Sequence, residues 1–388
     1  MKKNLLSLAV VAALSTGAYA TEPATSSLTE SIQQGISHVS LRYRYENVDQ
    51  DGFSDNAESS SVRLRLNFET KKYNDFSFFV EADHLAEAWG TDFNSLANGD
   101  TQHPVIADPL YTEMNQAYVS YNGFDKTTIK YGRQRINLDN QRFIGGVGWR
   151  QNEQTYDGFT IVNTSIKDLT LVYANLYNVN TILDKNISAG HHHILNAKYD
   201  GSGLGSISGY AYLLENITDT YGLRLTGKQK MGELNWGYEA EFATQETDNT
   251  ASINTDYYHF STTLGNNSIT GQLGYEVHTA DQGVAFQTPL GTNHAFNGWA
   301  DKFLGTPADG LEDLYVGAII PAAGMNFKLF YHDFSANKGN TNYGTELDFV
   351  AVKKFAKNYA VTFKYASYSA DSFSKDTDKL WVMLTADF

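Results

Sequence analysis

Apolar and polar residues alternate along much of this chain, and the stretch SSVRLRLNFET at residues 60–70 shows the pattern in its simplest form. Val62 and Leu64 alternate there with Arg63 and Arg65. Successive side chains of a strand point to opposite sides of the sheet, so strict alternation predicts a strand with one apolar and one polar face. The two faces of such a strand must meet different surroundings.

Similar segments of about ten residues follow one another from about residue 36 onward, and helical periodicity is almost absent. Short connections such as NGFDK and DGSG alternate with long ones that are rich in Gly, Asn, Asp and Thr. Bacterial outer-membrane barrels have short periplasmic turns and longer outer loops. The pattern therefore predicts an all-β fold, a transmembrane antiparallel up-and-down β-barrel of about 18 strands, with 16 as the alternative count.

The first 20 residues, MKKNLLSLAVVAALSTGAYA, combine a Lys-Lys start, a short apolar run and a small-residue end. This combination predicts a secretory signal peptide over residues 1–20, which leaves residues 21–388 as one barrel domain. An exported chain without cysteine has no disulfide framework to stabilise it. The formal net charge of -15 argues against nucleic acid as a partner.

Four arginines share the polar faces of two predicted strands, and the cost of exposing them to lipid decides where they point. An arginine on the lipid face near the bilayer midplane costs roughly 2 to 4 kcal/mol, so four would cost about 8 to 16 kcal/mol. We therefore expect them to face the aqueous lumen of a wide barrel. The same parity predicts a pore-lining set of Arg42, Arg44, Arg63, Arg65, Glu81, Asp83, Arg224, Glu239 and Glu241.

Residues that face each other across an antiparallel hairpin are set by the centre of the turn. The turn positions predict Arg42 opposite Arg65, Arg44 opposite Arg63, Arg65 opposite Glu81, Arg63 opposite Asp83, and Arg224 opposite Glu239. One hypothesis is that the basic rows attract anionic groups of passing solutes, with acidic side chains across the lumen completing a transverse field. The alternative, of equal weight, is that the charges pair only to hold the wall.

Two long connections, residues 86–110 and 279–310, carry tryptophan and phenylalanine residues that a freely solvated loop would not favour. Connections of this length are usually functional. We expect one or both to dip into the lumen.

Other chemistry finds little support in the chain. His191, His192 and His193 are consecutive, so on a strand at most two share a face, and no cysteine or carboxylate pair completes a metal site. No G-x-S-x-G motif of a serine hydrolase occurs. We predict no catalytic residue, metal site or cofactor.

The chain resembles Gram-negative outer-membrane porins, and within them the alginate-export family of 18-stranded barrels. The resemblance rests on the signal sequence, the opening strand LRYRYENV, the run YGRQRINLDNQRFIGGVGWRQNEQTYDGFTI at residues 131–161, and the terminal Phe388. A terminal aromatic residue after alternating apolar ones resembles the assembly signal of outer-membrane proteins.

This resemblance implies a passive channel in the bacterial outer membrane, and for the alginate-export family an arginine-lined route for an acidic polysaccharide. Because the chain is shorter than a dedicated exporter, the predicted function is a porin for small hydrophilic solutes, anionic oligosaccharides among them. The alternatives are an outer-membrane barrel enzyme or an exporter of an acidic polysaccharide. The implied partners are the lipid bilayer and lipopolysaccharide, small hydrophilic solutes, and the outer-membrane assembly machinery through Phe388.

Overall fold

The computed structural model describes residues 25–187, 190–247 and 253–388, so the predicted signal peptide lies outside the described residues. The first strands are β1 (Ile36–Gln50), β2 (Ala57–Glu69), β3 (Phe76–Glu87), β4 (Tyr111–Phe124), β5 (Thr127–Gln134), β6 (Thr155–Asn163), β7 (Leu169–Asn180), β8 (Asn186–Ile187), β9 (His192–Ser202), β10 (Gly205–Leu214) and β11 (Thr218–Met231). They are followed by β12 (Leu234–Thr247), β13 (Asn254–Gly265), β14 (Thr270–His278), β15 (Ala280–Asp281), β16 (Val284–Ala285), β17 (Leu311–Ala322), β18 (Met325–Ser335), β19 (Asn342–Phe355), β20 (Tyr359–Ala370) and β21 (Thr377–Asp387).

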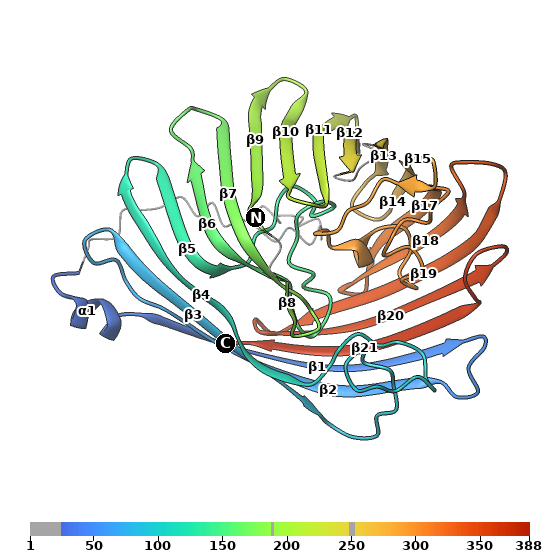
Figure 1. Cartoon of the computed structure of the whole chain (residues 1–388), viewed down its shortest axis with the longest axis horizontal. Helices are drawn as coiled ribbons and strands as arrows, with labels where there is room; N and C mark the ends of the chain where they lie inside the picture. The colour runs from blue at the N-terminus through green and yellow to red at the C-terminus, as the bar shows by residue number, and fades with distance from the viewer. Residues whose placement is uncertain (1–24, 188–189, 248–252) are drawn as a thin grey trace.

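The long strands form one closed antiparallel sheet (Figure 1). Nineteen of the described strands belong to it, and one of these, β8, has two residues. The other eighteen pair with their neighbours in chain order, and β21 pairs with β1 to close the ring. The predicted barrel of 18 strands is thus confirmed. The prediction that residues 21–388 form one domain extends beyond the described residues and stays a prediction.

In the described ranges of the chain, two short helices accompany the barrel. Helix α1 (Leu28–Gln33) precedes β1, and the Ser27 side chain caps it by accepting a hydrogen bond from the backbone N–H of Glu30. Such a cap satisfies one of the free N–H groups of the first turn. The 3-10 helix η1 (Asn293–Ala295) lies in the connection between β16 and β17. Among the described residues no helix is both long and apolar enough to cross a membrane.

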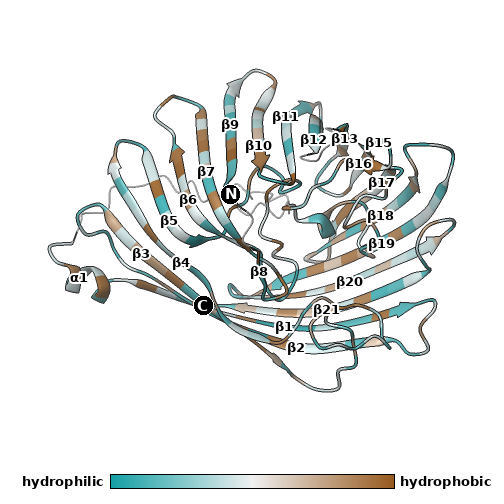
Figure 2. Cartoon of the chain, in the orientation of Figure 1, coloured by the Kyte–Doolittle hydropathy of each residue, from teal (hydrophilic) through white to brown (hydrophobic). Residues whose placement is uncertain are grey.

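Burial along the strands is the reverse of that in a water-soluble protein. Apolar side chains are exposed on the outside, as for Leu66 at 47% and Leu314 at 50%, whereas Arg44 and Asp313 on the inner face are fully buried. Figure 2 shows apolar and polar residues alternating along the strands. An outer surface of this kind requires an apolar surrounding, and the arginines face inward as predicted.

In each predicted pair of facing residues, the observed partner lies two positions away from the predicted one. Arg42 faces Arg63 and Arg44 faces Ser61 in the observed ladder. Arg65 faces Asp83, while Leu85 and Asn67 take the positions opposite Arg63 and Glu81, and Arg224 faces Glu241. The β2–β3 turn is centred one residue later than predicted because Asn74 and Asp75 adopt positive φ angles of 48° and 68°. A shift of two keeps every side chain on its predicted face, since the period of a strand is two.

Candidate channel constriction

Two connections fold into the barrel rather than away from it (Figure 1). We call residues 135–154, between β5 and β6, inner loop A, and residues 286–310, before β17, inner loop B. The two run side by side: the N–H of Gly145 donates to the carbonyl of Leu290 at 2.9 Å, and the N–H of Thr292 donates to the carbonyl of Gln141 at 2.9 Å. Inner loop A extends as far as Gln154, because β6 starts only at Thr155.

The last part of inner loop A is fastened to β1 by arginine side chains. Arg42 donates from Nε to the side-chain oxygen of Gln151 at 2.8 Å and from Nη1 to the carbonyl of Gly148 at 3.0 Å, with a third bond to the carbonyl of Arg150. Arg44 donates to the carbonyl of Trp149 at 2.6 Å. The loop backbone therefore finds in the barrel wall the donors that water would otherwise supply.

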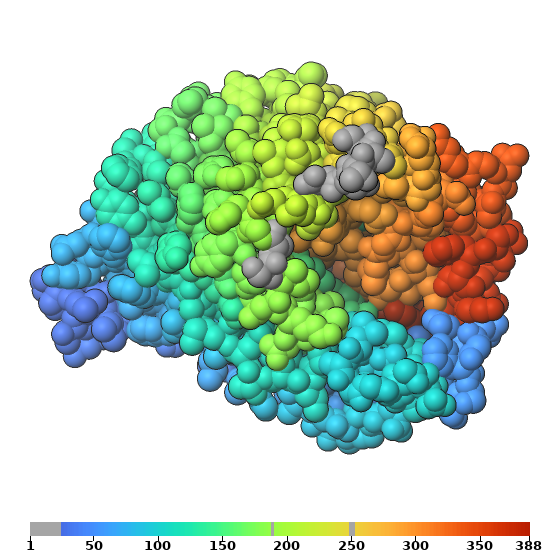
Figure 3. All heavy atoms as spheres, viewed as in Figure 1, coloured from blue at the N-terminus to red at the C-terminus, as the bar shows by residue number. Residues whose placement is uncertain are grey.

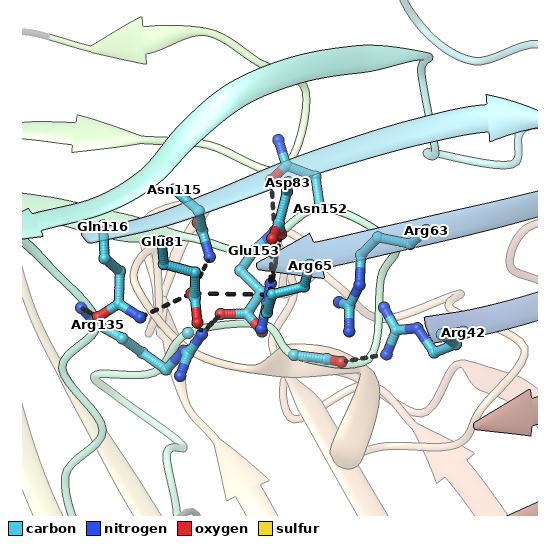
Figure 4. Close-up of polar contacts among 12 residues, drawn as sticks. Arg42, Arg63, Arg65, Glu81, Asp83, Asn115, Gln116, Arg135, Asn152 and Glu153 are labelled. Atoms are coloured by element: carbon cyan, nitrogen blue, oxygen red, sulfur yellow. Dashed lines mark hydrogen bonds and ion pairs between the residues drawn. The ribbon is translucent and has the colours of Figure 1, made fainter. Parts of the chain in front are cut away.

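A network of buried ion pairs continues this attachment on β2 and β3 (Figure 4). Arg65 Nη2 lies 2.6 Å from an oxygen of Asp83, and Arg65 Nη1 lies 2.5 Å from an oxygen of Glu153 in inner loop A. Arg135, at the start of the same loop, lies 3.2 Å from Glu81 and also contacts Glu153. Burial alone would raise the pKa of Glu153, but Arg135 and Arg65 outweigh it and hold that pKa far below its ordinary value.

A second group of charges joins the outer connection between β3 and β4 to this network. Asp108 lies 3.1 Å from Arg44 and accepts a bond from the backbone N–H of Gln151 at 2.8 Å. Arg150 pairs with Glu46 on β1 at 3.1 Å. Burial would raise the pKa of Asp108, but the guanidinium groups of Arg44 and Arg150 lower it. Residues 86–110 thus contribute one inward carboxylate.

The middle of inner loop A reaches a different part of the wall. Phe143 packs against Tyr210 on β10 and Tyr257 on β13, with ring centroids 5.2 Å and 5.4 Å away, and against Phe286 of inner loop B at 5.9 Å. Arg142 forms an ion pair with Glu276 on β14 at 2.7 Å. Inner loop A therefore spans the lumen from the β1–β3 wall to the β10–β14 wall.

Inner loop B is held by charge and by aromatic stacking. Asp301 lies 2.8 Å from both Lys379 on β21 and Arg150 of inner loop A. His294 stacks on Trp149 with ring centroids 4.4 Å apart, and its Nε2 lies 2.6 Å from Nζ of Lys364 on β20. Burial would raise the pKa of Asp301, but His294, Lys379 and Arg150 hold it well below its ordinary value. The prediction that residues 279–310 dip into the lumen agrees with this placement.

Three further predicted residues form a separate cluster on β11 and β12. Arg224 lies 2.9 Å from Glu239 and 3.5 Å from Glu241, and Tyr210 donates to Glu241 at 2.7 Å. His259 on β13 completes a set whose donor atoms all lie within 4.8 Å of one another and could hold a metal ion. Arg224 already contacts both carboxylates, and its positive charge disfavours a cation there.

All nine predicted residues face the interior, but the structure divides them between the inner-loop network and the cluster around Arg224. Whether any of them contacts a passing solute stays a prediction. Parity reasoning missed the residues of the connections that complete the network: Asp108, Arg135, Arg142, Arg150, Glu153 and Asp301. For the four of these residues that lie in inner loop A, the signal in the sequence is the density of arginine, asparagine and glutamine in a run where the alternation breaks down near Arg133.

The predicted histidine triplet separates as strand geometry requires. His192 is fully buried, while Nδ1 of His193 lies 2.9 Å from the hydroxyl of Tyr173 on β7.

In space-filling view the molecule is hollowed near its middle, where early, central and late parts of the chain border the recess (Figure 3). A charged interior of this kind, crossed by two inner loops, can select solutes by size and charge.

Residues 1–201 match the family model described as Campylobacter major outer membrane protein. The chain belongs to this family. Among proteins with curated descriptions, no sequence relative was found. Membership of the major outer membrane protein family, together with the closed barrel, makes this chain a porin of the outer membrane, where lipid and lipopolysaccharide surround it.

Solved porin structures share the fold over almost the whole chain. The structure of OpdK from Pseudomonas aeruginosa with vanillate has a TM-score of 0.77 at 15% identity, covering 92% of this chain and 99% of that one. OccAB4 from Acinetobacter baumannii has a TM-score of 0.75 at 16% identity, covering 91% and 98%. OccK8 (OprE) from Pseudomonas aeruginosa has a TM-score of 0.74 at 14% identity, covering 92% and 99%.

These comparisons confirm the predicted outer-membrane porin. They support the broad resemblance stated from the sequence, but not the alginate-export family in particular. The chain thus belongs to the Campylobacter major outer membrane protein family and shares its fold with the Opr and Occ porins.

Proposed function

We propose that this porin admits small hydrophilic solutes by passive diffusion and favours those that carry an anionic group. The observation that carries the proposal is the row of buried arginines on β1 and β2, which meets inner loop A where that loop crosses the lumen. Guanidinium groups match carboxylate oxygens in charge and geometry. A solute that passes this row gains attraction where inner loop A crosses the channel.

Acidic side chains on other parts of the wall support the proposal of a transverse electric field across the lumen. Glu276 on β14, Asp313 on β17 and Glu346 on β19 all face inward and are at most 2% exposed. Histidines accompany them, such as His332, whose Nδ1 lies 2.9 Å from Asp313. Basic and acidic groups are thus concentrated on different strands, which orients a charged solute as it crosses.

The inner loops favour small solutes over a polymer. Inner loop A spans the lumen from Arg42 on β1 to Tyr210 on β10, and inner loop B lies beside it. An acidic polysaccharide exporter requires a continuous wide route, so we retain short anionic oligosaccharides as the largest candidate solutes. Vanillate, present in the OpdK structure, is a small carboxylate of the class we propose. The barrel with its two inner loops has the architecture of a channel, and we propose no enzymatic role.

Assembly through the last residue remains part of the proposal. The backbone of Phe388 exchanges hydrogen bonds with Val39 at 2.9 Å and 3.0 Å, and its side chain is 55% exposed. We propose that the exposed terminal aromatic is read by the outer-membrane assembly machinery.

The test is the reversal potential across a bilayer with a KCl gradient, using a variant with Arg42, Arg44, Arg63 and Arg65 changed to Gln. We expect its selectivity to shift toward cations, because the fixed positive charge is lost. Changing Lys167, whose side chain is 92% exposed, to Gln is the matched control and should leave the potential unchanged. A heat-modifiable gel band shows that each barrel has assembled. An assembled quadruple variant with the wild-type reversal potential would overturn the proposal.

A further inference from the structure

The connection between β3 and β4, residues 88–110, folds back onto the wall at the end of the barrel that carries the long connections (Figure 1). The backbones of Asp92 and Glu58 exchange two hydrogen bonds, at 2.9 Å and 3.0 Å. Phe93 packs against a buried apolar cluster that includes Ile106. These contacts leave a cavity of about 710 Å³ between the connection and the first residues of β2. Small-molecule sites in proteins have volumes of roughly 300 to 1,000 Å³.

Ser59 on β2 lines this cavity with a hydroxyl that has no partner. The residue is 3% exposed, and in the described part of the chain no hydrogen bond reaches its hydroxyl, whereas a buried hydroxyl normally has one. Ser61, two positions along, accepts a bond from the side chain of Gln151 in inner loop A at 2.9 Å. Residues two apart on a strand share a face, so Ser59 also points to the inside of the barrel.

Two carboxylates line the same cavity with oxygens to spare. Glu87, the last residue of β3, accepts a bond from the hydroxyl of Thr91 with one oxygen only. Asp92 is exposed, and among the described residues its carboxylate accepts no side-chain hydrogen bond and forms no ion pair. A carboxylate has about four acceptor positions on its two oxygens. Glu87 and Asp92 can therefore accept several further hydrogen bonds from a ligand.

The charges around the cavity exclude an anion. Asp100 and Asp108 border it as well, but each already contacts a histidine or an arginine, at 2.8 Å and 3.1 Å. Among the described residues, no lysine or arginine lines the cavity. A suitable ligand must therefore supply hydrogen-bond donors and carry no negative charge.

Apolar side chains form another part of the lining. Phe93, Ala97, Pro109 and Leu110 contribute to it, and Leu110 is 56% exposed. An ammonium group would leave this apolar lining unused, and it has no acceptor for the hydroxyl of Ser59. A sugar ring carries hydroxyl groups that both donate and accept, and it has C–H faces that suit apolar side chains.

We propose that this cavity binds the hydroxyl-bearing ring of an uncharged saccharide at the mouth of the channel. Glu87 and Asp92 accept hydrogen bonds from ring hydroxyls, Ser59 bonds to another, and the apolar lining covers a C–H face. Hydrogen bonds to ionised acceptors are the strong ones, so the two carboxylates provide most of the affinity. The site uses no arginine of β1 or β2, and it adds a second class of solute to the anions of the proposed function.

The experiment records single-channel current in KCl while maltose is titrated. We expect saturable interruptions of the wild-type current. Asp92→Ala should weaken the apparent affinity about tenfold or more, as loss of a charged hydrogen bond implies, and Asp92→Asn, which keeps an acceptor, should restore part of it. Ser59→Ala should weaken it roughly two- to tenfold. Asp55→Ala removes an exposed carboxylate of the β1–β2 connection that does not line the cavity, and it should leave maltose affinity unchanged.

Two further probes separate a saccharide site from its alternatives. Triethylene glycol dimethyl ether is uncharged and has no hydroxyl, so we expect no saturable interruption from it, and interruptions as strong as those of maltose would overturn the proposal. Saturable interruptions by methylammonium that Asp92→Ala abolishes, without maltose interruptions, would show a cation site instead.

A heat-modifiable gel band shows that each variant barrel has assembled. Equal maltose affinity of wild type, Asp92→Ala and Ser59→Ala, or no saturable effect of maltose on wild type, also overturns the saccharide site. The proposed preference for anions is tested separately by the reversal potential, because maltose carries no charge.

Discussion

Replacing Glu153 by Gln removes the carboxylate that fastens the end of inner loop A to the wall. The wild-type oxygens lie 2.5 Å from Arg65 Nη1 and also contact Arg135, and the glutamate side chain is 7% exposed. Arg65 keeps Asp83 at 2.6 Å, and Arg135 keeps Glu81 at 3.2 Å. The substitution therefore weakens the attachment of the loop without leaving either arginine unpaired.

The magnitude follows from the contacts that remain. Removing one partner of a buried ion pair costs roughly 3 to 5 kcal/mol when the other is left alone. Because both arginines retain a carboxylate, we take the lower end, about 3 kcal/mol, for Glu153→Gln. This lowers the ratio of attached to detached loop end by roughly 150-fold. The barrel ladder does not involve Glu153, so the barrel should still assemble.

Single-channel recording and liposome swelling test this expectation. We expect a higher mean conductance, more open-channel noise, and passage of larger neutral sugars than through the wild type. Glu58→Gln removes an exposed carboxylate on β2 and is the matched control, with conductance and size limit unchanged. A heat-modifiable Glu153→Gln barrel with wild-type conductance, noise and size limit would refute the idea that this ion pair restrains the loop.

Two further predictions address the other attachments of inner loop A. Phe143→Ala should cost about 3 to 5 kcal/mol, because its packing against Tyr210, Tyr257 and Phe286 is lost, and it should raise the size limit in liposome swelling. Phe124→Ala, at a 60% exposed position, is the control and should leave that size limit unchanged. The lowered pKa of Glu153 means that its stabilisation is present above the ordinary glutamate pKa of about 4.3 and is lost as pH falls through the lower folded value. Wild-type conductance should therefore be the same at pH 7 and pH 5, and a rise between them would contradict this assignment.

The sequence itself determined which segments form strands and which of their side chains point into the barrel, because both depend on local geometry. The alternation around Arg63 and Arg65 requires one polar face, and the cost of arginine in lipid requires that face to point inward. Neither argument needs a distant contact. For the same reason the two-residue register errors did not disturb the predicted facing: alternation specifies parity, whereas register depends on turn conformations such as that of Asn74.

Only the tertiary structure decided what the inward arginines touch. Arg42 and Gln151 are 109 positions apart, and Arg150 and Asp301 are 151 apart. Inner loop A has no periodicity that would reveal such partners, since its backbone is satisfied by side chains of the wall rather than by a regular ladder. The sequence determined that positive charge enters the lumen, because burial in lipid forbids the alternative. Folding decided that most of this charge holds two loops across the channel, because only the closed barrel brings those distant groups within bonding distance.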